Sequence, residues 1–158
     1  MHLVVGLGNP GDRYVWTRHN LGFRVVEALA ARAGLRFGPV QAGCTAAAGA
    51  IAGREVVLVK PVLSMNRSGE ALAAWARARG LTLVPAGDPA PDPAPEAAAA
   101  QSGPPAPDPP LAVCDDIALP LGSLRLRAGG SDGGHRGLES LGRALAGTGF
   151  PRLRLGAD

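Results

Sequence analysis

The stretch Val4-Val5-Gly6-Leu7-Gly8-Asn9-Pro10-Gly11 decides how the rest of the chain is arranged. The apolar run at residues 3–5, which leads into this stretch, predicts a short buried strand. Gly-Asn-Pro-Gly predicts an irregular turn directly after that strand. Helical periodicity begins at Leu21. A strand therefore presents Asn9 at its end, a polar loop presents His19, and the helix that follows anchors both residues.

The same stretch matches the Gly-x-Gly-x-x-Gly fingerprint of dinucleotide-binding proteins at positions 6, 8 and 11. That fingerprint requires its last glycine to open a helix whose N-terminus holds a pyrophosphate. Here Pro10 directs Asn9 away from the helical region, and about ten loop residues precede the predicted helix. We keep a nucleotide-binding oxidoreductase only as an alternative, because the fingerprint alone supports it.

The composition indicates one globular domain. The chain has 158 residues, of which 46% are hydrophobic and only 4% aromatic, so its core must consist largely of alanine, valine and leucine. Cys44 and Cys114 show no metal-binding spacing, and the histidines are far apart, so we expect no metal and a cytoplasmic protein with reduced thiols. No apolar run has the length of a membrane span, and no signal-peptide pattern is present.

The basic residues allow two interpretations. The formal net charge is +3, and of the 16 basic residues only Lys60 is a lysine. The bias could reflect arginine-rich codon usage. It could equally reflect a partner with phosphates, which guanidinium groups bind in a bidentate manner.

Strand and helix patterns roughly alternate along the chain, which is typical of an α/β fold. Helices are predicted over residues 21–33, 68–79 and 138–145, with Ser68 as the N-cap of the second. Strands are predicted over residues 3–5, 44–52, 55–59, 111–114 and 123–127, and from Arg152 onward, with a hairpin turn at Gly53-Arg54.

Residues 82–110 differ from the rest of the chain. They are mostly proline, alanine, glycine and aspartate, with no aromatic residue and no period. Such a segment cannot bury enough apolar surface to offset its ordering entropy, so we expect a disordered insertion. A proline-rich ligand for a partner protein is the alternative interpretation.

Several polar residues follow predicted strands, where ligands of α/β sheets gather. Asn9, Asn66 and Asp115 each lie just past a strand, His135 follows a fourth, and His19 lies on the first loop. An imidazole can deprotonate water, a carboxylate can orient that imidazole, and carboxamides can hold a substrate or an oxyanion. Each of these residues could also be an ordinary turn or surface residue.

A series of motifs runs along the chain in a fixed order. The most specific are Gly-Leu-Gly-Asn-Pro-Gly at 6–11, Thr-Arg-His-Asn at 17–20, Met-Asn-x-Ser-Gly at 65–69, Asp115-Asp116, and Gly-Gly-His-Arg-Gly at 133–137. In type, number and order these motifs resemble those of bacterial-type peptidyl-tRNA hydrolase. The resemblance covers the whole chain except the segment rich in proline and alanine.

The resemblance implies a single-domain, three-layer α/β/α sandwich around a mixed, mostly parallel sheet. It implies a monomeric, cofactor-independent enzyme that hydrolyses the ester joining a peptide to the 3′ ribose of tRNA. By position, His19 is expected to be the catalytic base and Asp115 its carboxylate partner. Asn9 is expected to recognise the peptidyl end, and Asn66 to orient the substrate at the reaction centre.

The resemblance also implies a set of substrate and tRNA contacts. Tyr14 and Ser64 are expected to border the 3′ end, and Arg127 and Arg154 to clamp a tRNA phosphate. The full set of expected binding residues is Tyr14, Ser64, Met65, Arg127, His135, Arg136 and Arg154.

Two departures from the family pattern lead to further expectations. The family usually carries asparagine where this chain has Arg136, and arginine can donate hydrogen bonds but cannot accept one. The family domain also continues past the last predicted strand with a lid-like loop and helices, so we expect a C-terminal part to be missing from this chain. A non-catalytic RNA-binding relative of the same fold is therefore the main alternative function.

Overall fold

A computed structural model describes residues 1–88 and 109–157 of the chain. Within these residues, one six-stranded sheet has the strand order β2-β3-β1-β4-β6-β5. The strands are β1 (His2–Gly6), β2 (Cys44–Ile51), β3 (Arg54–Pro61), β4 (Leu111–Asp116), β5 (Leu124–Arg127) and β6 (Arg152–Gly156). The α-helices are α1 (Leu21–Arg32), α2 (Ser68–Ala78) and α3 (Arg136–Ala144), and the short 3-10 helices are η1 (Asp12–Tyr14), η2 (Arg18–Asn20) and η3 (Met65–Arg67).

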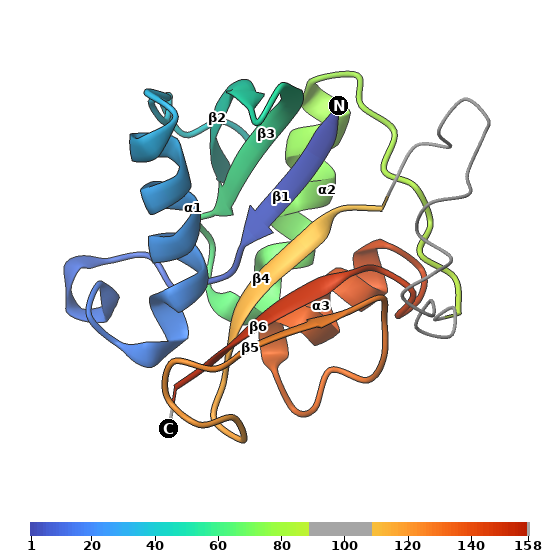
Figure 1. Cartoon of the computed structure of the whole chain (residues 1–158). Coiled ribbons are helices and arrows are strands. Elements are labelled where there is room, and N and C mark those ends of the chain that lie inside the picture. Colours follow the sequence, from blue (N-terminus) through green and yellow to red (C-terminus); the bar gives the residue numbers. More distant parts are fainter. Residues whose placement is uncertain (89–108, 158) are drawn as a thin grey trace.

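The sheet is mixed, as expected. Strands β3, β1, β4 and β6 run parallel to one another, while β2 and β5 are antiparallel to their neighbours at the two edges. Helix α1 covers one face and helices α2 and α3 cover the other (Figure 1). The predicted three-layer α/β/α architecture is therefore confirmed.

Side chains along the central strands point alternately to the two faces of the sheet, so the core is divided between these faces. Val26 and Ala30 of α1 pack with Leu58 of β3 on one side of the sheet. Val5 of β1 packs with residues of α2 and α3, including Leu72, on the other side. Neighbouring residues of a strand point to opposite faces, so strands with helices on both sides must be apolar throughout.

The start of α1 is pressed directly against the end of β1, and a glycine makes this contact possible. A Cβ atom on Gly22 would lie 2.3 Å from the carbonyl oxygen of Val113 and 2.5 Å from the backbone nitrogen of Leu7. No side chain fits in that space. The contact fixes the position of the residues just before the helix, including His19.

Replacing Gly22 with alanine should lower the free energy of unfolding by about 3 kcal/mol, because the new methyl group would push α1 away from the sheet. Urea denaturation would measure the change. Gly142→Ala in α3 is the matched control. Its Cβ would meet its nearest atom at 3.5 Å, so this substitution should be neutral or slightly stabilising. Equal stabilities for the two variants would contradict the packing argument.

Some predicted element details are wrong. Ser68 is not an N-cap: η3 runs straight into α2, and the Ser68 hydroxyl donates to the carbonyl oxygen of Met65 at 2.8 Å. Asp115 and Asp116 lie inside β4 rather than after it, because pairing with β6 continues to Gly156. Arg136 opens α3 instead of lying in the glycine loop.

The predicted disordered insertion, residues 82–110, is too long at both ends. Leu83 and Ala86 pack against the core, and the backbone N–H of Ala86 donates to the carbonyl oxygen of Leu145 at 2.7 Å. At the other end, Pro110 is buried just before β4. These apolar contacts order residues 82–88 and 109–110, and the remaining residues of the predicted insertion, 89–108, lie outside the described ones.

The antiparallel pair of strands β5 and β6 has two unlike faces. Arg125 pairs with Arg154 and Arg127 with Arg152, so these four arginines share one face. The opposite face carries leucines, and Leu124 and Leu126 are about two-thirds exposed. The predicted basic face of residues 123–127 is confirmed, and the register extends it to β6.

Candidate active site

A histidine and an aspartate meet where β4 ends. The Nδ1 atom of His19, on η2, lies 3.0 Å from Oδ2 of Asp115. Asp115 is only 3% exposed, whereas the His19 side chain is 54% exposed. The carboxylate can only accept a hydrogen bond, so Nδ1 carries the proton and Nε2 is left as a proton acceptor open to solvent.

A second histidine holds the other oxygen of the same carboxylate. His135 Nε2 lies 3.0 Å from Oδ1 of Asp115. The Nδ1 atom of His135 accepts from the backbone N–H groups of Gly137 and Leu138, at 3.1 and 3.3 Å, and so caps the N-terminus of α3. His135 is therefore the neutral tautomer that donates from Nε2, and it ties Asp115 to a helix end.

These contacts determine the ionisation of Asp115. Burial by itself would raise the pKa of the carboxyl group. The hydrogen bond from His135 and the electrostatic attraction of the two imidazoles act in the opposite direction and prevail, so the pKa of Asp115 lies below its ordinary value. Asp115 is thus held as a carboxylate that can stabilise a positive charge on His19.

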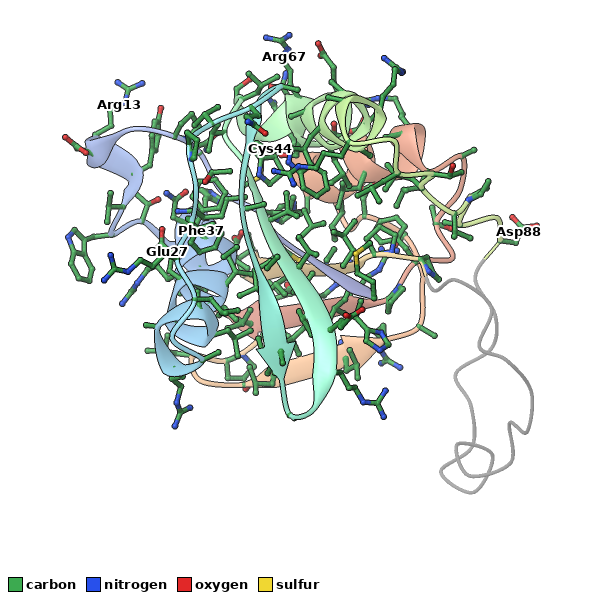
Figure 2. All side chains as sticks on the ribbon, turned by 90° about the horizontal axis from the view of Figure 1, so that it is seen from above. Arg13, Glu27, Phe37, Cys44, Arg67 and Asp88 are labelled. Atoms are coloured by element: carbon green, nitrogen blue, oxygen red, sulfur yellow. The ribbon has the colours of Figure 1, made fainter. Side chains whose placement is uncertain are left out.

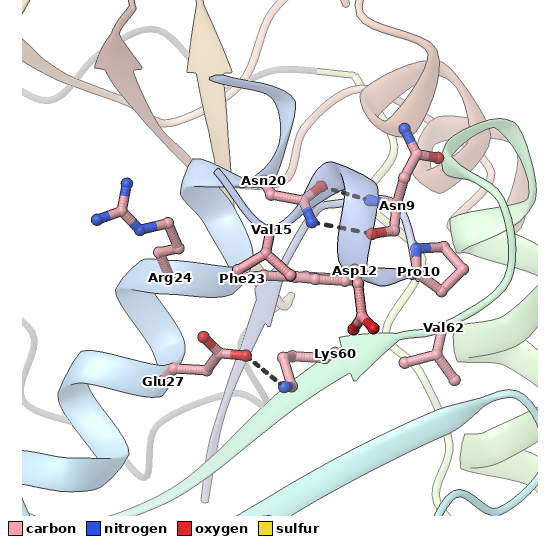
Figure 3. Close-up of a pocket in the computed structure, with 11 residues that line it drawn as sticks. Asn9, Pro10, Asp12, Val15, Asn20, Phe23, Arg24, Glu27, Lys60 and Val62 are labelled. Carbon is pink, nitrogen blue, oxygen red and sulfur yellow. Dashed lines mark hydrogen bonds and ion pairs between the residues drawn. The ribbon is translucent and has the colours of Figure 1, made fainter. Parts of the chain in front are cut away.

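Asn9 is held rigidly by backbone and side-chain hydrogen bonds. Its N–H donates to Oδ1 of Asn20 at 2.7 Å, and its carbonyl oxygen accepts from Nδ2 of Asn20 at 2.9 Å (Figure 3). Its side-chain Oδ1 accepts from the backbone N–H of Met65 at 2.8 Å. The amide orientation this imposes leaves Nδ2 of Asn9 as a donor. Asn20 was not predicted as a site residue, although its place beside His19 in the motif was a usable signal.

A cleft of about 250 Å³ opens above the His19–Asp115 pair. It is lined by Asn9, His19, Met65, Gly134, His135 and Arg136. The structure thus brings five predicted site residues together in this cleft: Asn9, His19, Met65, His135 and Arg136. An open imidazole nitrogen and a fixed amide face the same small space, which suits proton abstraction from a water beside a bound carbonyl.

Asn66, Ser64 and Tyr14 are among the predicted residues that do not line this cleft. Asn66 is exposed on η3, and its Oδ1 accepts from the Ser64 hydroxyl at 2.8 Å. The hydroxyl of Tyr14 accepts from the Arg13 guanidinium at 2.7 Å, and that guanidinium also lies over the tyrosine ring. Local hydrogen bonds thus hold these polar groups outside the cleft.

A separate cavity of about 450 Å³ lies on the basic face of the paired strands β5 and β6, where Arg125, Arg127, Arg152 and Arg154 line it. Arg154 donates to the Ser131 carbonyl oxygen at 2.9 Å and contacts Asp116 at 3.5 Å. Four guanidinium groups against one carboxylate make this cavity suited to an anion.

Arg152 has a structural part in the same cavity. It is 1% exposed, and its guanidinium donates to the carbonyl oxygens of Gly130, Ser131 and Thr148. Burial, together with the neighbouring charge of Arg154, lowers the pKa of Arg152. In the sequence it is only an arginine at the start of a strand, and no sequence signal marks that it organises the glycine loop.

Within residues 1–88 and 109–157, no group of three or more histidine, cysteine, aspartate or glutamate side chains is placed to hold a metal ion. In the same part of the chain, no helix is long and apolar enough to cross a membrane.

The family model described as peptidyl-tRNA hydrolase matches residues 3–84 and 97–158 of this chain. The chain belongs to the peptidyl-tRNA hydrolase family. A peptidyl-tRNA hydrolase of Chloroflexus aurantiacus is 44% identical over 156 residues, which are 99% of this chain and 71% of that protein. One of Mycobacterium avium is 40% identical over 155 residues, covering 98% of this chain and 69% of that protein.

Solved structures agree with the family assignment. The crystal structure of peptidyl-tRNA hydrolase from Acinetobacter baumannii superposes with a TM-score of 0.76 at 32% identity, and the match covers all of this chain and 69% of that one. The dinucleotide-binding alternative has no support in the fold, because Gly11 precedes η1 and α1 begins only at Leu21.

Proposed function

We propose that this protein hydrolyses the ester bond between the peptide and the tRNA of peptidyl-tRNA, which releases free tRNA for reuse in translation. The observation that carries the proposal is the contact of His19 with the buried carboxylate of Asp115, at the floor of a cleft that Asn9 also lines. Membership in the peptidyl-tRNA hydrolase family supports the choice of substrate.

The chemistry follows from the proton positions. Nε2 of His19 takes a proton from a water molecule as the water oxygen attacks the ester carbonyl carbon, and Asp115 stabilises the imidazolium that forms. Nδ2 of Asn9 donates to the substrate carbonyl oxygen as negative charge develops there. The imidazolium then gives its proton to the 3′ oxygen of the ribose, the carbon–oxygen bond breaks, and the peptide leaves with a free carboxyl group.

The remaining expected contacts belong to the same proposal. Met65 and Arg136 border the reaction centre, and Asn66, Tyr14 and Ser64 approach the acceptor end from the loops beside the cleft. The protein acts as a monomer in the cytoplasm, where peptidyl-tRNA is produced. No organic cofactor is needed, because water, one base and fixed hydrogen-bond donors suffice for ester hydrolysis.

The direct test uses a purified peptidyl-tRNA and, as a control, the same tRNA carrying an unblocked amino acid. We expect the first to be cleaved to free tRNA and peptide and the second to be spared. Tight binding of peptidyl-tRNA without any release of tRNA would instead support the non-catalytic RNA-binding alternative.

Arg127→Ala and Arg154→Ala should each weaken tRNA binding, because we propose that the cavity between β5 and the glycine loop clamps a backbone phosphate. Each lost phosphate contact should reduce the slope of log affinity against log salt by about one unit. Binding isotherms at several salt concentrations measure this slope. Arg54→Ala, at the start of β3, is the matched control and should leave the slope unchanged. A wild-type slope in both cavity variants would refute the clamp.

A further inference from the structure

An exposed tryptophan lies on the loop that carries His19, three residues before it. Trp16 is 80% exposed, on the short connection between η1 and η2. Tryptophan carries a large apolar surface, and it is usually covered unless it serves an interface. No step of the proposed hydrolysis uses this ring.

The tryptophan ring is backed by an arginine from the first turns of α1. The guanidinium carbon of Arg24 lies 4.8 Å from the centre of the Trp16 ring. A guanidinium on one face holds the indole in place by a cation–π contact and leaves the rest of the ring open. With the side chain 80% exposed, most of the ring surface is accessible from solvent.

The surroundings of Trp16 carry more positive than negative charge. Arg13, Arg18 and Arg24 are all exposed on this loop and the adjoining turn of α1, and Arg13 projects outward (Figure 2). The acids within residues 11–27 are Asp12 and Glu27, and Glu27 is paired with Lys60 at 2.6 Å. The loop therefore combines a flat apolar surface with groups that attract phosphates.

The same short loop carries both Trp16 and His19. Backbone hydrogen bonds from Thr17 to Tyr14 and from Asn20 to Thr17 hold the loop in two tight turns. Trp16 precedes His19 by three residues, so their Cα atoms are at most about 11 Å apart. A pocket of about 230 Å³ is lined by Arg24, which contacts the Trp16 ring, and by Asn9, which also lines the active-site cleft (Figure 3).

We propose that Trp16, backed by Arg24, is a stacking platform for an unpaired nucleobase of RNA. A π-face accepts any base, and the neighbouring arginines attract the phosphates on either side of it. The identity of the RNA rests on the proposed function: the unpaired 3′ end of tRNA must lie in the cleft for its ester to reach His19. Trp16 is then a binding residue that helps to hold this end beside the catalytic base.

The test compares two short single-stranded RNA oligonucleotides that end in CCA, one normal and one with abasic nucleotides in place of the last three. Both have the same phosphates, so only stacking and base contacts distinguish them. The wild-type protein should bind the normal oligonucleotide more tightly and show quenched tryptophan fluorescence, since the other tryptophan, Trp75, is buried. Trp16→Leu should lower affinity for the normal oligonucleotide by about 5- to 100-fold and should remove the discrimination.

Two further variants make the experiment decisive. Trp16→Phe keeps a flat ring and should retain most of the discrimination. Val40→Ala removes another exposed apolar side chain, on the connection between α1 and β2, and should bind both oligonucleotides as the wild type does. If Trp16→Leu discriminates as well as the wild type, or if the wild type does not discriminate at all, the platform is refuted.

Peptidyl-tRNA hydrolysis by the wild type is measured separately. Hydrolysis without discrimination between the oligonucleotides would refute only the platform. Discrimination without hydrolysis would refute only the proposed function.

Discussion

His19→Ala should lower the rate of peptidyl-tRNA cleavage under single-turnover conditions by roughly 10²–10⁴-fold, because the general base is lost. The side chain is about half exposed and its only hydrogen bond among the described residues is to Asp115, so the fold should tolerate the change. The affinity for tRNA should stay nearly the same, since the proposed phosphate contacts lie on β5 and β6.

The control for this experiment is His2→Ala, which removes a histidine from the far end of β1 and should cleave at the wild-type rate. Rapid mixing of excess enzyme with labelled peptidyl-tRNA separates the chemical step from product release. Near-normal cleavage by His19→Ala would exclude the proposed mechanism, whatever the binding measurements give.

Asp115→Asn should reduce the rate of cleavage by on the order of 10³–10⁴-fold, although the two side chains have nearly the same volume. The carboxylate accepts one hydrogen bond from each of two imidazoles, at 3.0 Å. An amide at this position has only one acceptor oxygen, so its NH₂ group must face one imidazole. Facing His19, it would force the proton onto Nε2 and abolish the base; facing His135, it would oppose an N–H that donates to the carboxylate.

The same variant should change the acid stability of the protein. The pKa of Asp115 in the folded protein is depressed, so the ionised carboxylate stabilises the fold above the unfolded-state pKa of about 4. This contribution is lost as the pH falls through the folded pKa. The difference in unfolding free energy between wild type and Asp115→Asn should therefore shrink between about pH 5 and pH 2. A constant difference, or unchanged cleavage by the variant, would show that the carboxylate is not coupled to the imidazoles.

The local signals of the chain located most elements correctly. Gly34, just after α1, and Gly53, in the β2–β3 turn, have φ of 69° and 75°, a conformation that favours glycine. The apolar runs and helical stripes between these breaks give strands and helices whose ends differ by only a few residues from those observed. Such features depend on neighbours along the chain, and the sequence displays those neighbours directly.

Local patterns misjudged two features. Ser68 reads as a cap, but η3 continues directly into α2. Residues 82–88 read as disordered, yet they pack beside the end of α3. The first is decided within one turn, by the hydrogen bond from the Ser68 hydroxyl to Met65, and the second by contacts with a distant element.

The sequence by itself determined the α/β class, the pattern of the central strands, and the motifs that resemble the peptidyl-tRNA hydrolase family. Only the tertiary structure decided that Asp115 serves two histidines, because His19 and His135 are 96 and 20 residues away from it along the chain. It likewise decided that β6 enters between β4 and β5 and aligns four arginines on one face. Strand order and long-range side-chain contacts of this kind follow from how helices and strands pack around a shared core, which no local pattern specifies.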